Sequence, residues 1–217
     1  MSRTIRLAAA MASLPLVAIL RGLRPHEAED VGLALVAAGF ALIEVPLNSP
    51  QPFDSIATLR RVLKPGTLVG AGTVTRVEDV QRLHAIGADL VVMPHADVAV
   101  IRAAKAAGML CVPGVATPTE AFAAIAAGAD ALKLFPAELV THGVMKAMRA
   151  VLPADVPLLP VGGITPASLA PWRAAGAKGF GLGSALYSPG LGADAVASNA
   201  ADFVRAWRAC SSAPPIS

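Results

Sequence analysis

The 217-residue sequence contains few charged residues, and those it has do not cluster. Asp, Glu, Lys and Arg make up 15% of the chain against 55% for hydrophobic residues, and the formal net charge is +3. The lysines and arginines form no run or stripe, which argues against nucleic acid as a partner. The modest positive net charge fits a small anionic substrate as well as it fits nucleic acid. The apolar excess is typical of a parallel sheet buried on both faces beneath helices.

Cysteine is nearly absent and histidine is sparse. The two cysteines, Cys111 and Cys210, have no metal-like spacing, and the four histidines share neither a spacing nor a carboxylate cluster. We therefore expect reduced thiols in a cytoplasmic protein, with no metal site and no cofactor. Cys111 lies in an apolar run without a neighbour suited to activate a nucleophile, so we expect it in the core.

Long apolar runs are also missing. No stretch reaches the roughly 18 uninterrupted apolar residues of a membrane-spanning helix, so no membrane partner is expected. Residues 1–20 have the basic start and apolar content of a signal peptide, but Pro15 splits the run into a helix and a strand. We therefore expect this segment to belong to the folded domain.

What the sequence does contain is a repeated alternation of strand-like and helix-like segments. Eight apolar runs begin at residues 16, 41, 67, 89, 109, 131, 157 and 179. Several of the intervening helical segments close on a glycine suited to a left-handed C-cap, at Gly39, Gly87, Gly108, Gly128 and Gly176. This alternation predicts an α/β fold in which eight parallel strands close as a (β/α)8 TIM barrel.

The predicted barrel occupies residues 1–210 as a single domain, with a short extra N-terminal helix over residues 3–12. A doubly wound sheet is less favoured, because residues 21–30 lack the G-x-G-x-x-G turn that such a sheet carries after its first strand. Residues 211–217 read SSAPPIS, a composition that predicts a disordered tail.

Two charged residues stand inside apolar strand-like runs. Lys133 lies in ALKLFPAE (131–138) and Glu44 lies in IEVPL (43–47). Burial favours the neutral amine, which can attack a carbonyl to form a Schiff base, and a nearby carboxylate can carry the protons that this chemistry moves. A purely structural ion pair between Lys133 and Glu44 is the alternative.

Further polar groups follow the strands at their carboxyl ends, where barrel enzymes build active sites. Arg21 follows the first strand and suits a carboxylate, whereas Thr73 ends the third strand, where it either orients substrate hydroxyls or caps a turn. The seventh and eighth strands end in glycine-rich segments whose N–H groups can approach an anion closely. We expect a phosphate site there, built from Gly162, Gly163, Gly183 and Ser184.

Seven segments of the chain resemble one enzyme family. They are ILRG (19–22), IEVPLNSP (43–50), VGAGTV (69–74), CVPG (111–114), EAFAAIAAGADALKLFP (120–136), VGGITP (161–166) and GLGSALY (181–187). Together they resemble the class I aldolases of 2-keto-3-deoxy-6-phospho sugar acids, over about residues 13–208. Within that family they look most like the branch that acts on 2-dehydro-3-deoxy-6-phosphogalactonate.

The resemblance implies a homotrimeric barrel enzyme that cleaves the phosphorylated keto acid to pyruvate and D-glyceraldehyde 3-phosphate. By position in the matching motifs, Lys133 would form the Schiff base and Glu44 would act as acid and base. Arg21 and Thr73 would bind the pyruvate carboxylate. The branch is indicated by PLNS in the second strand segment and by Val161, where gluconate-type enzymes tend to have threonine. Val161 offers no hydroxyl partner to the C4 oxygen, the centre at which the two sugars differ.

Other functions remain open from the sequence. The gluconate-derived epimer is an alternative substrate, alone or together with the galactonate one. A phosphate-binding barrel isomerase or decarboxylase would need no imine. A non-catalytic ligand-binding barrel would leave two buried charges unexplained.

Overall fold

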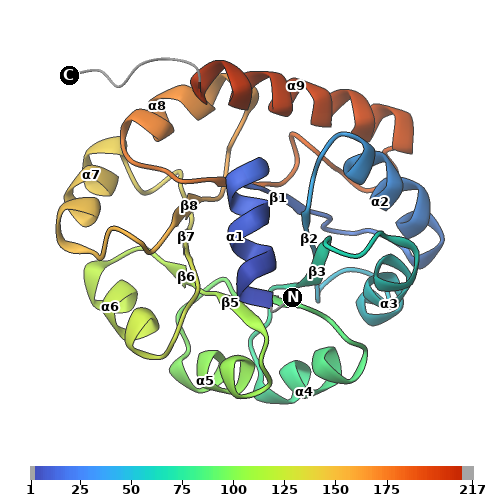
Figure 1. Cartoon of the computed structure of the whole chain (residues 1–217), viewed down its shortest axis with the longest axis horizontal. Helices are drawn as coiled ribbons and strands as arrows, with labels where there is room; N and C mark the ends of the chain where they lie inside the picture. Colours follow the sequence, from blue (N-terminus) through green and yellow to red (C-terminus); the bar gives the residue numbers. More distant parts are fainter. Residues whose placement is uncertain (1–2, 212–217) are drawn as a thin grey trace.

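The computed structural model describes residues 3–211, in which strands alternate with helices along the chain (Figure 1). The strands are β1 (Leu16–Ile19), β2 (Leu42–Pro46), β3 (Leu68–Gly72), β4 (Leu90–Val92), β5 (Leu110–Val112), β6 (Gly114–Val115), β7 (Leu132–Leu134), β8 (Leu158–Pro160) and β9 (Phe180–Leu182). The helices are α1 (Arg3–Ser13), α2 (Ala28–Ala37), α3 (Pro52–Val62), α4 (Val77–Ala85), α5 (Val98–Ala106), α6 (Pro118–Ala126), α7 (His142–Val151), α8 (Leu169–Ala174) and α9 (Ala193–Ser211), with short 3-10 helices η1 (Pro25–Glu27) and η2 (Pro166–Ser168).

The predicted positions of the strands and of the N-terminal helix are confirmed. Every strand lies within one of the predicted apolar runs except β6, which ends one residue beyond the fifth run at Val115, and α1 ends one residue beyond the predicted helix. The predicted tail lies outside the described residues, except for Ser211, which ends α9. Within residues 3–211, no helix is long and apolar enough to cross a membrane.

The predicted closure as a (β/α)8 TIM barrel is wrong, because the described strands form two separate parallel sheets. Six strands pair in the order β5-β4-β3-β2-β1-β9, and three pair in the order β6-β7-β8. Pro113 divides the fifth apolar run into β5 and β6, since proline has no N–H to donate to a ladder. Between β8 and β9, one isolated bridge joins Val161 to Gly181. The fold is α/β, with a ladder that does not close.

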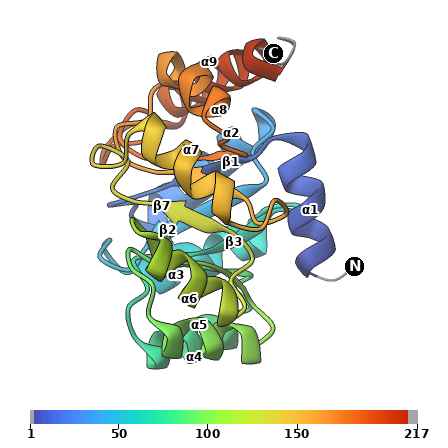
Figure 2. The same ribbon diagram turned by 90° about the vertical axis from the view of Figure 1, so that its left-hand side faces the viewer.

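The strands face an interior, and most of the helices lie outside them. Figure 1 shows α2 to α9 arranged around the strands, and Figure 2 shows α1 to one side of them, at one end. Alternate residues of a strand pack in different clusters: Ile43 and Val45 of β2 belong to an outer cluster, whereas Leu42 belongs to an inner one. Leu7 and Ala10 of α1 belong to that inner cluster. Helix α1 therefore covers the amino-terminal end of the interior.

The predicted glycine helix ends are confirmed by backbone conformation. Gly39, Gly87, Gly108, Gly128 and Gly176 have φ between +66° and +109°. Residues with a Cβ rarely adopt this left-handed region, so glycine lets the chain leave each helix and turn toward the next strand.

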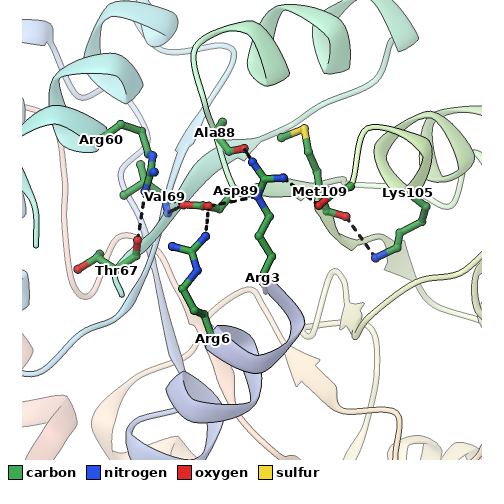
Figure 3. A network of polar contacts seen from close by, with 10 residues as sticks. Arg3, Arg6, Arg60, Thr67, Val69, Ala88, Asp89, Lys105 and Met109 are labelled. Atoms are coloured by element: carbon green, nitrogen blue, oxygen red, sulfur yellow. Dashed lines mark hydrogen bonds and ion pairs between the residues drawn. The ribbon is translucent and has the colours of Figure 1, made fainter. Parts of the chain in front are cut away.

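A buried aspartate connects α1 to the rest of the fold. Asp89, immediately before β4, forms ion pairs with Arg3 and Arg6 of α1 and with Arg60 of α3 (Figure 3). The Arg3 Nε and Arg60 Nη1 atoms lie 3.3 Å and 2.7 Å from its carboxylate oxygens. The same carboxylate accepts a hydrogen bond from the Val69 N–H of β3 at 3.3 Å. One side chain thus joins α1, α3 and the larger sheet.

Cys111 occupies the core position that the sequence predicted. It is completely buried, and burial raises the pKa of its thiol to about 12, with the nearby Asp130 carboxylate acting in the same direction. Such a thiol stays protonated at neutral pH and is a poor nucleophile.

Candidate active site

Lys133 and Glu44 face the interior from different sheets. Lys133 is the central residue of β7 and Glu44 is the central residue of β2. The two residues are only 7% and 1% exposed, and they line one interior cavity whose other lining residues are all apolar. The fold therefore brings together the two charged residues that the sequence singled out, from positions 89 residues apart (133 − 44).

Burial favours the neutral form of both groups. It lowers the pKa of the Lys133 amine, against the opposing influence of the Glu44 carboxylate, and the positive charge of Arg21 lowers that pKa further. It raises the pKa of Glu44, although the charges of Lys133 and Arg21 act in the opposite direction. A lysine whose pKa is lowered has a larger fraction of the neutral, nucleophilic amine at neutral pH.

The alternative of a structural ion pair is not what the structure contains. Within residues 3–211, no ion pair of 4.0 Å or less joins Lys133 to Glu44, and Glu44 Oε2 has no hydrogen-bond partner. The Lys133 Nζ atom lies 4.5 Å from the centroid of the Phe135 ring. A buried carboxylate oxygen without a partner destabilises the fold. Packing alone therefore gives no reason for a glutamate at this position.

A second cavity, of about 400 Å³, opens beyond the carboxyl ends of β1, β7, β8 and β9. Lys133 and Val161 line both cavities, so the amine lies where they adjoin. The other predicted site residues that line the opening are Arg21, Gly162, Gly163, Gly183 and Ser184. Glu44 lines the interior cavity only, and Thr73 lines neither.

Thr73 follows a glycine that makes room for Glu44. A Cβ at Gly72 would lie 1.3 Å from Glu44 Oε2, so any larger residue would displace the carboxylate. Thr73 itself has φ of +55°, which is rare for a β-branched residue. Strain of this kind is common at functional sites, and the sequence indicated the residue without indicating its conformation.

The two glycine-rich loops present backbone donors to the opening. The N–H groups of Gly163 and Ser184 donate to no acceptor in the described part of the chain. Gly162 and Gly163 have φ of +116° and +59°, a conformation that favours glycine. A Cβ at Gly183 would meet nothing within 4 Å, so glycine there leaves the opening unobstructed. The loops can therefore accept an anion.

The chemical groups of this site suit a ligand with two anionic ends. Arg21 offers a guanidinium to a carboxylate, the loops offer N–H groups to a phosphate, and Lys133 lies in the same opening, where a carbonyl can reach it. Among the described residues, no group of three or more His, Cys, Asp or Glu could hold a metal ion.

One family of known proteins matches almost the whole of this chain. The family model described as KDPG and KHG aldolase matches residues 7–201. The chain belongs to the KDPG and KHG aldolase family.

The relatives of this aldolase are similar over nearly their whole length. It is 49% identical to the probable 2-dehydro-3-deoxy-6-phosphogalactonate aldolase of Rhizobium meliloti (strain 1021), over 90% of this chain and 92% of the relative. It is 47% identical to the 2-dehydro-3-deoxy-6-phosphogalactonate aldolase of Escherichia coli (strain K12), over 90% and 95%. A solved structure described as native KDPGal superimposes with a TM-score of 0.90 at 46% identity, over 92% of this aldolase and 97% of that chain.

Two residues at the mouth of the aldolase's site were missed by sequence reasoning. Glu138 lines the opening, and a Cβ at Gly162 would lie 2.2 Å from its Oε2. Its place shortly after β7 is a signal that could have identified it. Asn48 Oδ1 accepts a hydrogen bond from Arg21 Nη1 at 2.7 Å, and only the packing of two loops reveals that contact.

Proposed function

We propose that this chain is a class I aldolase that cleaves 2-dehydro-3-deoxy-6-phosphogalactonate to pyruvate and D-glyceraldehyde 3-phosphate, a degradative step in the use of galactonate. The observation that carries the proposal is the burial of Lys133 and Glu44 at one interior cavity, without a mutual ion pair. The names and identities of the relatives support the choice of substrate.

In the proposed mechanism, Lys133 provides the nucleophile. Its neutral Nζ attacks C2 of the keto acid, forming a carbinolamine, and loss of water gives an iminium ion. The positive iminium nitrogen then accepts the electron pair released when the C3–C4 bond breaks. The lowered pKa of Lys133 supports this role, because a protonated amine has no electron pair with which to attack.

Glu44 moves the protons. As the carboxylate, it removes the proton of the C4 hydroxyl while the C3–C4 bond breaks, which releases D-glyceraldehyde 3-phosphate and leaves an enamine on Lys133. The glutamic acid so formed protonates C3, and addition of water to the iminium releases pyruvate and restores the amine. A raised pKa supports this role, because it brings the carboxyl group closer to balance between its two protonation states.

The two ends of the substrate are assigned to different groups of the site. Arg21 and Thr73 bind the C1 carboxylate. The C6 phosphate accepts hydrogen bonds from the glycine-rich loops, through Gly162, Gly163, Gly183 and Ser184. The cavity lining supports this assignment for Arg21 and for the loops, and the strained backbone supports it for Thr73.

Val161 is the proposed determinant of epimer preference. It lines both cavities beside Lys133, and its methyl groups occupy space that Gly181 leaves free, since a Cβ there would lie 2.6 Å from Val161 Cγ2. An apolar side chain at this place offers no hydrogen bond to the C4 hydroxyl of the gluconate-derived epimer. That epimer is the second candidate substrate.

Borohydride reduction in the presence of pyruvate tests the imine. We expect a stable pyruvate adduct on Lys133 by peptide mass spectrometry, and none in Lys133→Met. Lys105→Met is the matched control, because Lys105 is paired with Asp130 at 2.6 Å and lies outside the cavity lining. This variant should still form the pyruvate adduct on Lys133. A wild-type enzyme that forms no adduct would favour an isomerase or decarboxylase that needs no imine.

We also propose that the chain assembles as a homotrimer. Large apolar side chains are exposed on α6, after β7 and on α7, at Phe122, Leu139 and Val144, with 47%, 78% and 42% of each residue exposed. Contiguous exposed apolar patches mark association surfaces, and we propose that these three side chains belong to one. Light scattering should give three times the chain mass for the wild type and a lower mass for Phe122→Lys with Leu139→Lys. Leu33→Lys on α2 is the control, and a monomeric wild type would contradict the proposal.

A further inference from the structure

Two hydrogen bonds join the loop that follows β1 to the loop that follows β2. Arg21 Nη1 donates to Asn48 Oδ1 at 2.7 Å, and the Gly22 N–H donates to Ser49 Oγ at 2.9 Å. Ser49 is buried, and Gly22 has φ of +85° with Pro189 against its α-carbon, so the backbone that carries the arginine is firmly placed. The guanidinium beyond it is exposed and receives its orientation from Asn48.

The hydrogen-bond partner of Arg21, Asn48, is neutral, so Arg21 keeps its full positive charge. A guanidinium has five N–H donors, and the amide oxygen of Asn48 takes one of them without cancelling the positive charge. The remaining donors and the full charge stay available to a substrate carboxylate. An aspartate at the same place would form an ion pair and neutralise much of that charge.

The charge of Arg21 also acts on the groups inside the cavity. It lowers the pKa of both Lys133 and Glu44. A neutral partner at residue 48 preserves this influence in the absence of substrate. Asn48 therefore affects the carboxylate end of the ligand and, through Arg21, the amine.

We propose that Asn48 is a positioning residue that orients the Arg21 guanidinium toward the substrate carboxylate while leaving its charge uncompensated. The inference deepens the proposed function and rests on it for the identity of the carboxylate. It also gives the segment PLNS a physical role, because Asn48 and Ser49 of that segment are the residues that hold Arg21 and Gly22.

Two substitutions separate orientation from charge. Asn48→Ala removes the hydrogen bond and should raise KM roughly three- to tenfold with little change in kcat, because a carboxylate contact is made equally in the ground state and the transition state. Asn48→Asp keeps an acceptor and neutralises Arg21, so it should raise KM further. It should also move the acid limb of the rate–pH profile to higher pH, because the pKa of Lys133 is then lowered less. Asn48→Ala should leave that limb closer to its wild-type position.

The design distinguishes this inference from failure of the imine mechanism. Pyruvate binding measured by calorimetry in a Lys133→Met background requires no imine, and Asn48→Ala and Asn48→Asp should still weaken it there. If wild type forms no adduct but this dependence remains, the mechanism fails and the role of Asn48 stands. Asn48 is only a surface contact if neither Asn48 substitution weakens pyruvate binding relative to Lys133→Met alone and neither shifts the acid limb of the otherwise wild-type enzyme. Glu78→Gln is the matched control, because its exposed pair with Arg76 lies away from the cavity.

Discussion

Glu44 and Lys133 are buried where their charged forms are disfavoured, so each destabilises the folded state at pH values where it would be charged in the unfolded chain. The pKa of Glu44 is higher in the folded chain than its ordinary value of 4.5, so its favourable contribution is complete below pH 4.5 and is lost as pH rises through the folded pKa. The pKa of Lys133 is below its ordinary 10.5, so the unfolded chain binds more protons between the two values and stability rises with pH across that window.

Glu44→Gln should lose activity and gain stability at the same time. We expect kcat to fall by roughly 10² to 10⁴, because the amide cannot carry the proton. The pyruvate adduct on Lys133 should be retained, because the amine is unchanged. Denaturant unfolding at pH 8 should show the variant more stable than wild type. That difference should shrink as pH falls toward 4.5, where both side chains are neutral. A variant less stable than wild type at every pH would mean that the carboxylate holds the fold together.

Val161→Thr should change epimer preference modestly. A hydrogen bond to a neutral group is worth about 0.5 to 1.5 kcal/mol net, so kcat/KM for the gluconate-derived substrate should rise by up to about tenfold. Formation of the pyruvate adduct should change little, because pyruvate has no C4. Both epimers would be assayed side by side, with Ile164→Val as a control for packing in the same loop. An unchanged ratio of the two efficiencies would assign Val161 to packing alone.

The candidate site could be predicted where a residue contradicts its own neighbours in the sequence. Lys133 and Glu44 stand out because each lies in an apolar strand, a conflict that is visible within a few residues. Asn48 lies in a polar loop and shows no such conflict, because its role depends on Arg21 from another loop. The positive φ of Thr73 is likewise a product of the surrounding fold, since threonine has no intrinsic preference for it.

At the scale of elements, α1 is the part of the fold most dependent on a single polar residue. Asp89 forms ion pairs with arginines of α1 and α3 (Figure 3). Leu7 and Met11 of α1 line the interior cavity that Lys133 also lines. Docking of α1 therefore covers the interior cavity on the side away from the substrate opening. Loosening the helix should return the pKa of Lys133 toward its ordinary value.

Asp89→Asn should destabilise the protein by about 3 kcal/mol, because it leaves the arginines without their buried counter-charge. Urea unfolding would measure this change. Amide exchange at Leu7 should accelerate, and the acid limb of the rate–pH profile should move to higher pH. Glu78→Gln, which removes an exposed pair with Arg76, should leave the free energy of unfolding nearly unchanged. Normal exchange in α1 of Asp89→Asn would show that apolar packing alone holds the helix.

The elements themselves followed from periodicity, but their pairing did not. Apolar runs and terminal glycines gave the positions of the strands and the ends of several helices, since these depend on local pattern and backbone conformation. Closure of the ladder depends on hydrogen bonds between strands distant in sequence. Pro113 was visible within the fifth run, but its effect on pairing became apparent only with the neighbouring strands in place.

At the scale of the whole molecule, the two sheets contribute different parts of the site. The larger sheet carries Glu44 and precedes Arg21, and the smaller sheet carries Lys133. The separation of amine and carboxylate is therefore set by how the two sheets pack, and not by pairing within one ladder.

The sparse pairing of β8 with β9 lies directly beneath the glycine-rich loops. Gly162 and Gly163 follow one strand, Gly183 and Ser184 follow the other, and the isolated bridge between Val161 and Gly181 spans the gap. A phosphate bound by both loops would link β8 to β9 through hydrogen bonds, so that the substrate adds a connection between two strands whose backbones share only one bridge. Inorganic phosphate should then raise Tm, by an amount equivalent to about 2.7 kcal/mol at 100 times its Kd, and slow amide exchange on both strands. Chloride at equal ionic strength should do neither, and stabilisation without slower exchange at β8 and β9 would locate the anion elsewhere. In each catalytic cycle, β8 and β9 would thus become more rigidly connected when the substrate binds and less so when the phosphorylated aldehyde leaves.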